Sequence, residues 1–112
     1  MTLPRVREVL ERHAGLFLLA YVYGSVASGK QDEASDVDLL LVRRTPAEFF
    51  DRIREVMALV SELGTADLLI YTPAELAELI ETRHNGFLED VVARGVKVEG
   101  RQGRGAALAA TS

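Results

Sequence analysis

Two aspartates and a glycine–serine pair are the residues whose types and spacing could do chemistry. Asp36 and Asp38 are separated by one residue within the stretch SDVDLLLV. In a strand, side chains at i and i+2 point to the same face, about 6.5 Å apart, so these carboxylates could hold one or two hard cations. Upstream, Gly24 and Ser25 form a turn and a short helix start, which offer backbone N–H groups to a phosphate. A cation and a phosphate on neighbouring strands are what phosphoryl or nucleotidyl transfer requires.

The strands that must position these residues follow from the hydrophobic pattern. Leu16 to Tyr23 is almost continuously apolar and predicts a strand buried on both faces. Val37 to Val42 predicts a second strand, in which alternate residues face opposite sides of the sheet and Asp38 shares its side with two apolar residues. A third strand is predicted at Ala66 to Tyr71, with Asp67 near its start, and a short edge strand at Val96 to Val98.

Helix starts and stops separate these strands. Thr2 and Pro4 open a first amphipathic helix, which Gly15 ends, and Ser25 is suited to cap a short helix after the first strand. The tetrapeptide Thr-Pro-Ala-Glu occurs at 45–48 and again at 72–75. Each copy predicts a capping box with proline at the first helical position.

The first of these tetrapeptides opens a helix that Gly64 closes. Its apolar residues recur at helical spacing and are expected to face the core: Phe49, Ile53, Val56, Met57 and Val60. The helix after the second tetrapeptide stops at Asn85-Gly86, and a last helical segment runs from Phe87 to Ala93.

This order of elements predicts an α/β (α+β) fold, a small mixed sheet with helices packed on it, spanning residues 1–100. It is not a doubly wound dinucleotide fold, which needs more strands and its own glycine pattern. Gln31 to Ser35 is polar and predicts a loop. Residues 101–112, RQGRGAALAATS, lack periodicity and predict a flexible tail.

Composition bounds the function further. The 112 residues suffice for one small domain, and the net charge of −4 gives no electrostatic footprint for nucleic acid or an anionic membrane. There is no cysteine, hence no disulfide or zinc–cysteine site. The charged N-terminus has no signal-peptide core, and the longest apolar run is too short to span a bilayer. We therefore expect a soluble cytoplasmic protein whose nucleotide substrates are neutralised by metal ions.

A second phosphate motif competes for the same loop. The stretch Gly24 to Lys30, GSVASGK, satisfies most of a P-loop, but Gln31 stands where that motif needs the Ser or Thr that holds Mg²⁺. The following residues, QDEASD, have no apolar stripe and lead straight into a strand, whereas a P-loop continues into a substantial helix. The P-loop interpretation is therefore disfavoured, and Lys30 is expected to be a solvated loop lysine.

The combination of Gly-Ser, ten intervening residues, Asp-x-Asp and an aspartate on a later strand resembles the nucleotidyltransferase (polymerase-beta-like) superfamily. More narrowly, the chain is similar to the minimal nucleotidyltransferases of bacteria and archaea. The resemblance rests on YGSVASG, SDVDLLLV and ADLLIYTPAEL and covers about residues 2 to 99. One difference is Val26, because many relatives carry Arg or Tyr directly after Gly-Ser.

The resemblance implies a role for each of five residues. Asp36, Asp38 and Asp67 would hold two Mg²⁺ ions, and Asp67 would also help to remove the proton of the acceptor hydroxyl. Gly24 would let the backbone approach the β- and γ-phosphates, and Ser25 would donate to a phosphate oxygen. The implied reaction is in-line attack on the α-phosphate of ATP, which transfers AMP to a hydroxyl and releases pyrophosphate.

Simpler explanations apply to some of these residues taken singly. Asp36 could cap a turn before its strand, and Asp67 could be a turn residue at a strand entrance. Asp38 has no such explanation, because an aspartate inside an apolar strand is costly unless a cation or several donors accompany it.

The resemblance also implies a partner. Minimal transferases are often paired with HEPN-domain toxins, and the transferase acts as an antitoxin by adding AMP to a tyrosine of the toxin. Two alternatives stay open: a subunit that neutralises its partner by contact with little or no transfer, and transfer to a small molecule such as an aminoglycoside. A homo-oligomer is also compatible with the sequence.

Overall fold

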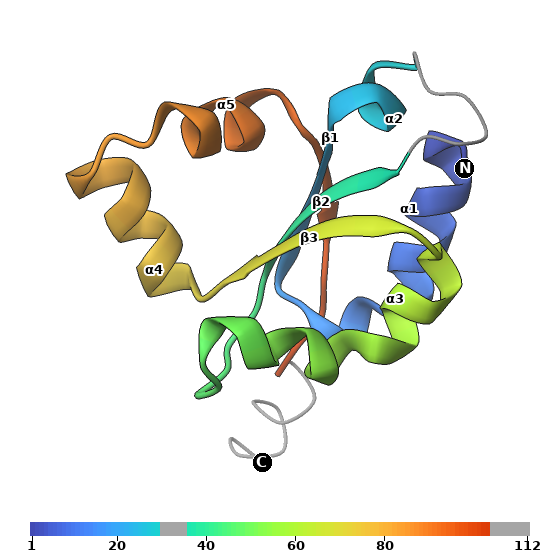
Figure 1. The fold of residues 1–112 in the computed structure, drawn as a ribbon, viewed down its shortest axis with the longest axis horizontal. Helices are drawn as coiled ribbons and strands as arrows, with labels where there is room; N and C mark the ends of the chain where they lie inside the picture. The colour runs from blue at the N-terminus through green and yellow to red at the C-terminus, as the bar shows by residue number, and fades with distance from the viewer. Residues whose placement is uncertain (30–35, 104–112) are drawn as a thin grey trace.

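The computed structural model describes residues 1–29 and 36–103, which form a four-stranded mixed sheet between two layers of helices (Figure 1). The strand order is β3-β2-β1-β4. β1 pairs antiparallel with both β2 and β4, and β2 pairs parallel with β3. The strands are β1 (Leu19–Tyr23), β2 (Val37–Val42), β3 (Ala66–Tyr71) and β4 (Val96–Glu99). The predicted fold class is confirmed, and three of the four predicted strands differ by at most one residue at either end.

The helical layers lie on opposite faces of this sheet, α1 and α3 on one side and α4 and α5 on the other (Figure 1). The longer helices are α1 (Leu3–Arg12), α3 (Met57–Leu63) and α5 (Gly86–Arg94). The shorter segments are the 3₁₀ turn η1 (Ala14–Leu16), α2 (Gly24–Ser28), the 3₁₀ helix η2 (Phe49–Val56), α4 (Pro73–Ala77) and the π-helical turn η3 (Glu78–Thr82). β1 begins three residues later than predicted because η1 occupies the start of the apolar run.

Each face of the sheet has its own hydrophobic core. Val37, Leu39 and Leu41 of β2 are buried against one layer together with residues of α1 and α3. Leu40 and Val42 belong to the other core, beneath α4 and α5. The alternation predicted for this strand is therefore confirmed. Each fully buried Leu or Val contributes about 1.5–3 kcal/mol, which makes a one-residue slip of β2 prohibitive. The face of every β2 side chain is fixed in this way.

The second Thr-Pro-Ala-Glu segment forms the predicted capping box. Thr72 Oγ1 accepts a hydrogen bond from the Glu75 N–H at 3.2 Å, and Glu75 Oε1 accepts one from the Thr72 N–H at 2.9 Å. α4 then begins at Pro73, as the motif requires.

The first Thr-Pro-Ala-Glu segment does not form a capping box, so this prediction is wrong. The Thr45 hydroxyl accepts from the Ala47 N–H and donates to Glu55, and Glu48 precedes a 3₁₀ helix without a side-chain cap. With 3.0 residues per turn instead of 3.6, the apolar positions change phase. Ile53 and Met57 are exposed as a result.

Val56 is buried and Val60 packs against the core, as predicted, and Leu59 and Leu63 provide the further core contacts of this region. The predicted loop from Gln31 to Ser35 and the predicted tail beyond Gly103 lie outside the described residues. The start of the predicted tail is hydrogen-bonded, since the backbone N–H groups of Arg101 and Gln102 donate to carbonyls of Ala14 and Phe17. In the parts of the chain that the structure describes, no helix has the length and apolar character needed to cross a membrane.

Candidate functional site

Asp38 and Asp67 lie side by side where β2 and β3 begin. The parallel register of the two strands pairs Asp38 with Asp67, and the antiparallel register of β1 and β2 pairs Asp38 with Tyr23. Paired residues on neighbouring strands point to the same face of a sheet. Three side chains from three strands therefore meet on the face that α5 partly covers.

The surroundings of Asp38 disfavour the charged form of its carboxylate. Its pKa is raised above the ordinary range, chiefly by burial and then by the negative charges of Asp67 and Asp36. Among the ion pairs of the described residues, none involves these three aspartates. A bound cation would relieve this repulsion.

Gly24 packs directly against the Asp38 carboxylate. Its φ of +73° lies in the left-handed region, and a Cβ built on it would lie 2.2 Å from Asp38 Oδ2. The absence of a side chain here therefore makes room for the Asp38 carboxylate itself, a role that the sequence did not reveal. The interpretation of Gly24 as a point of phosphate approach stays a prediction.

Ser25 lies in the first turn of α2 and does not cap it. The residue that precedes the helix is Tyr23, and it makes no side-chain capping bond. The prediction that Ser25 caps this helix is therefore wrong, because the helix starts one residue earlier than Ser25. Its carbonyl accepts from the Ser28 hydroxyl at 3.2 Å. A phosphate-binding role for the Ser25 hydroxyl stays a prediction.

Asp36 stands just before β2 and is exposed. Its charge reaches Asp38, but within residues 1–29 and 36–103 no three His, Asp or Glu side chains come close enough together to hold one metal ion. What the fold brings together is thus the pair Asp38 and Asp67. Mg²⁺ is commonly bound by one or two carboxylates, with waters and substrate phosphates completing its octahedron. The pair fits such an ion.

Tyr23 also lies at this site, opposite Asp38 on the neighbouring strand. Burial raises the pKa of its hydroxyl, and the charges of Asp38, Asp67 and Tyr71 raise it further. Its ring meets the exposed Phe87 edge to face, with centroids 5.5 Å apart. The alternation in β1 gives the face of Tyr23, but its position opposite Asp38 depends on the pairing register, which the sequence does not specify.

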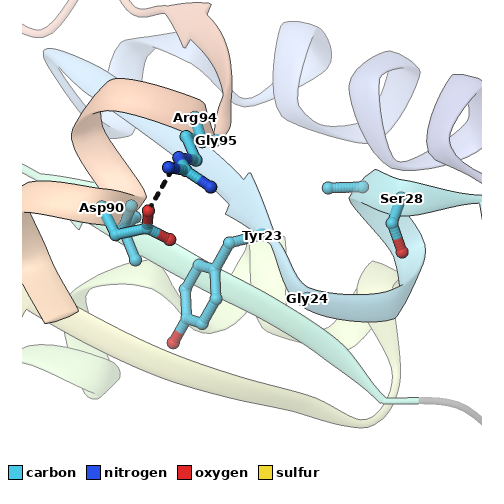
Figure 2. A pocket seen from close by; sticks show the side chains of 8 residues that line it. Tyr23, Gly24, Ser28, Asp90, Arg94 and Gly95 are labelled. Carbon is cyan, nitrogen blue, oxygen red and sulfur yellow. Dashed lines mark ion pairs between the residues drawn. The ribbon is translucent and has the colours of Figure 1, made fainter.

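A cavity of about 190 Å³ lies between α2 and the end of α5 (Figure 2). One wall is α2 and the other is the end of α5, with Tyr23 and Gly24 between them. On the α5 wall, Arg94 pairs with Asp90 at 3.0 Å. The residues that line the cavity are Tyr23, Gly24, Ala27, Ser28, Asp90, Val91, Arg94 and Gly95. Gly24 lines the cavity and also lies next to Asp38, so the cavity neighbours the aspartate pair.

Comparisons with known proteins agree with this geometry. No curated protein was found to be similar in sequence. The crystal structure of a candidate nucleotidyltransferase from Sulfolobus solfataricus is similar, with 28% sequence identity, a TM-score of 0.51, and coverage of 66% of this chain and 69% of that one. The family described as "Polymerase beta, Nucleotidyltransferase" matches residues 5–102, a range that contains all five predicted site residues. The chain therefore belongs to the polymerase beta nucleotidyltransferase family, as its Gly-Ser and Asp-x-Asp motifs predicted.

Proposed function

We propose that this protein is an Mg²⁺-dependent nucleotidyltransferase that transfers AMP from ATP to an acceptor hydroxyl. The observation that supports this most strongly is the pair Asp38 and Asp67, two like charges held together over Gly24 with the pKa of Asp38 raised. A fold places such a pair at a cost, and perturbed carboxylates of this kind mark functional sites more often than structural ones.

The side chains divide the work as follows. Asp38 and Asp67, with Asp36 at the edge, would hold Mg²⁺, and Ser25 would donate to a phosphate oxygen. Bound there, the metal would neutralise the triphosphate and lower the pKa of the acceptor hydroxyl. Asp67 is the exposed member of the pair and would accept the proton of that hydroxyl. The acceptor oxygen bonds to the α-phosphorus, the bond to the bridging oxygen breaks, and pyrophosphate leaves.

The acceptor is a tyrosine of a HEPN-domain toxin, and the protein serves as the antitoxin of a two-component system. This part of the proposal rests on the resemblance to minimal nucleotidyltransferases. It is compatible with a site that is open to solvent on the Asp67 side, where a tyrosine on another protein could reach it.

The test is transfer of label from [α-³²P]ATP to a co-purified HEPN protein in the presence of Mg²⁺. We expect label on the wild-type toxin, none when its acceptor tyrosine is replaced by phenylalanine, and none with Asp36→Asn/Asp38→Asn. Label on RNA or on a small molecule instead would contradict the proposed acceptor. No labelled product with any acceptor class would contradict the proposed activity.

A second candidate is neutralisation of the partner by contact alone. Apolar side chains on η2 and α3 favour it, because Phe50 is 89% exposed and Ile53 and Met57 are also exposed. Exposed apolar groups gathered on one element are typical of an interaction surface. If Asp36→Asn/Asp38→Asn protects cells from the toxin as well as wild type does, this second function is correct and transfer is dispensable.

A further inference from the structure

The cavity between α2 and α5 is too small for a whole nucleotide. Pockets that enclose a drug-sized ligand measure roughly 300–1,000 Å³, whereas this one measures about 190 Å³. It adjoins the Asp38 carboxylate through Gly24, on the side of the site nearest β1 and α5. Its volume and position suit one part of a substrate whose reacting atom lies at the carboxylates.

The charge of the lining indicates which part. Arg94 is the one cationic side chain among the lining residues, and Asp90 is the one anionic side chain. Ser28, on the opposite wall, already donates its hydroxyl hydrogen to the Ser25 carbonyl. Val26, in the first turn of α2, is fully buried in the core, so α2 brings no cation to this cavity. Arg94 is thus the charged donor that the cavity offers.

The ion pair with Asp90 does not prevent Arg94 from binding an anion. The two side chains are 82% and 60% exposed and lie at i and i+4 of α5. Such exposed pairs are weak, because solvent screens them. A guanidinium has five N–H donors and binds phosphate oxygens bidentately, so a polyphosphate competes effectively with a single exposed carboxylate. Figure 2 shows Arg94 on the α5 wall, across the cavity from Ser28.

We infer that this cavity receives the β- and γ-phosphates of the nucleoside triphosphate and that Arg94 is the residue that binds them. This rests on the proposed function, because those phosphates are the pyrophosphate that leaves when AMP is transferred. Arg94 supplies from α5 a positive charge that the region around Asp36, Asp38 and Asp67 lacks among the described residues. The subsite therefore discriminates nucleotides by the number of their phosphates.

Calorimetric titration of the full chain with MgATP, AMP and inorganic pyrophosphate tests the inference. For Arg94→Ala we expect MgATP and pyrophosphate to bind at least about tenfold more weakly, the usual loss for a hydrogen bond to a charged group. AMP, which lacks both phosphates, should bind within about twofold of wild type. Asp90→Asn should bind pyrophosphate about two- to threefold more tightly, because Arg94 then has no competing carboxylate.

Arg83→Ala is the matched control, since Arg83 is an exposed arginine just after η3 that pairs with Glu78 at 3.8 Å. It should leave all three affinities unchanged. Equal binding of MgATP by wild type and Arg94→Ala, with transfer intact, overturns the inference and keeps the proposed function. Pyrophosphate binding that depends on Arg94 in a protein that transfers nothing to any acceptor supports the subsite and overturns the function. A loss seen in Lys30→Ala but not in Arg94→Ala assigns the role to Lys30 and overturns the inference.

Discussion

The two ends of β3 lie beside carboxylates whose pKa values are shifted in opposite directions. Just beyond the end of the strand, Glu75 binds Arg52 through both oxygens, at 2.6 and 3.0 Å. Arg52 is almost fully buried and also donates to the carbonyls of Ala47 and Ile70. The hydrogen bonds that Glu75 accepts lower its pKa to about 2; those from Arg52 are the largest cause, and the backbone of Thr72 contributes further.

Beside the start of the same strand, the pKa of Asp38 on the neighbouring strand β2 is shifted in the opposite direction. Asp67 lies beside Asp38, and the pKa of Asp38 is raised, because burial and a second carboxylate disfavour its charged form. Glu75 is surrounded by the Arg52 guanidinium and a backbone donor. Asp38 and Asp67 have no cationic partner among the described ion pairs. This contrast supports the proposal that Asp38 and Asp67 bind a ligand, at some cost to stability.

The largest expected effect separates activity from stability at the Asp67 end. Asp67→Asn should lower the rate of nucleotidyl transfer at least about 100-fold, since a group that stabilises the transition state electrostatically is lost. The same change should leave the free energy of unfolding unchanged or raise it by up to about 1 kcal/mol, because it removes like-charge repulsion. Transfer kinetics and urea unfolding measure the two quantities.

Asp51→Asn, on the surface of η2, is the control and should change the free energy of unfolding by less than about 0.5 kcal/mol. An Asp67→Asn protein that is clearly less stable than wild type would mean that the aspartate pair has a structural role, and the contrast between the two ends would fail.

The second-largest effect is expected at Glu75, where a substitution should lower stability and leave activity unchanged. Glu75→Gln should destabilise the fold by about 2 kcal/mol, because it leaves the buried Arg52 without its counter-charge and turns an amide N–H toward it. Transfer per folded molecule should not change. Glu48→Gln, in the identical Thr-Pro-Ala-Glu sequence, should cost less than about 0.5 kcal/mol, since Glu48 makes no capping bond. Equal costs for the two variants would show that Arg52 is not the cause.

These identical tetrapeptides also show the limit of prediction from sequence. Both have the residues of a capping box, yet only Thr72 and Glu75 form one. At the first copy, the Thr45 hydroxyl accepts from the Ala47 N–H instead of the Glu48 N–H, and it donates to Glu55 of η2. Contacts with η2 therefore replace the capping box that the local sequence favours. The helix that follows is 3₁₀ over Phe49–Val56, and of the positions expected to face the core Ile53 and Met57 are exposed, whereas Val56 is buried as predicted.

The strands were predictable because burial alone determines them. β2 and β3 begin and end where the apolar pattern predicts, and the alternation in β2 gives the face of Asp38. The pairing of Asp38 with Asp67 and Tyr23 was not predictable, because strand register depends on contacts between segments far apart in sequence. The cavity was not predictable for the same reason, because its walls come from α2 and α5, which are far apart in the sequence.

Acid should weaken the Glu75 end. The folded-state pKa of Glu75, about 2, lies below its ordinary value of 4.5, so its contribution to stability is complete above pH 4.5 and is lost as the pH falls toward 2. The side chain is 42% exposed, and solvent screening reduces this contribution to about 1 kcal/mol. The difference in unfolding free energy between wild type and Glu75→Gln should therefore narrow by about that amount between pH 5 and pH 2.5. A constant difference over this range would mean that the carboxylate charge does not stabilise the fold.

The smallest expected effect concerns Gly24, which packs against Asp38. Gly24 and Gly29 have nearly the same φ, +73° and +75°, but a Cβ on Gly24 meets Asp38 Oδ2 at 2.2 Å and one on Gly29 meets nothing within 4 Å. Gly29→Ala should cost about 1 kcal/mol of backbone strain. Gly24→Ala should cost about 0.5–1 kcal/mol more, because the Asp38 carboxylate must move.

A double-mutant cycle isolates that excess. In an Asp38→Ala background the oxygen is gone, so alanine at position 24 should cost only the backbone strain that it costs at position 29. The excess cost measured in wild type is then the free energy needed to displace the Asp38 carboxylate from its position next to Gly24. If the excess persists without the carboxylate, the clash is with the backbone instead, and Gly24 is needed for the turn rather than for the position of Asp38.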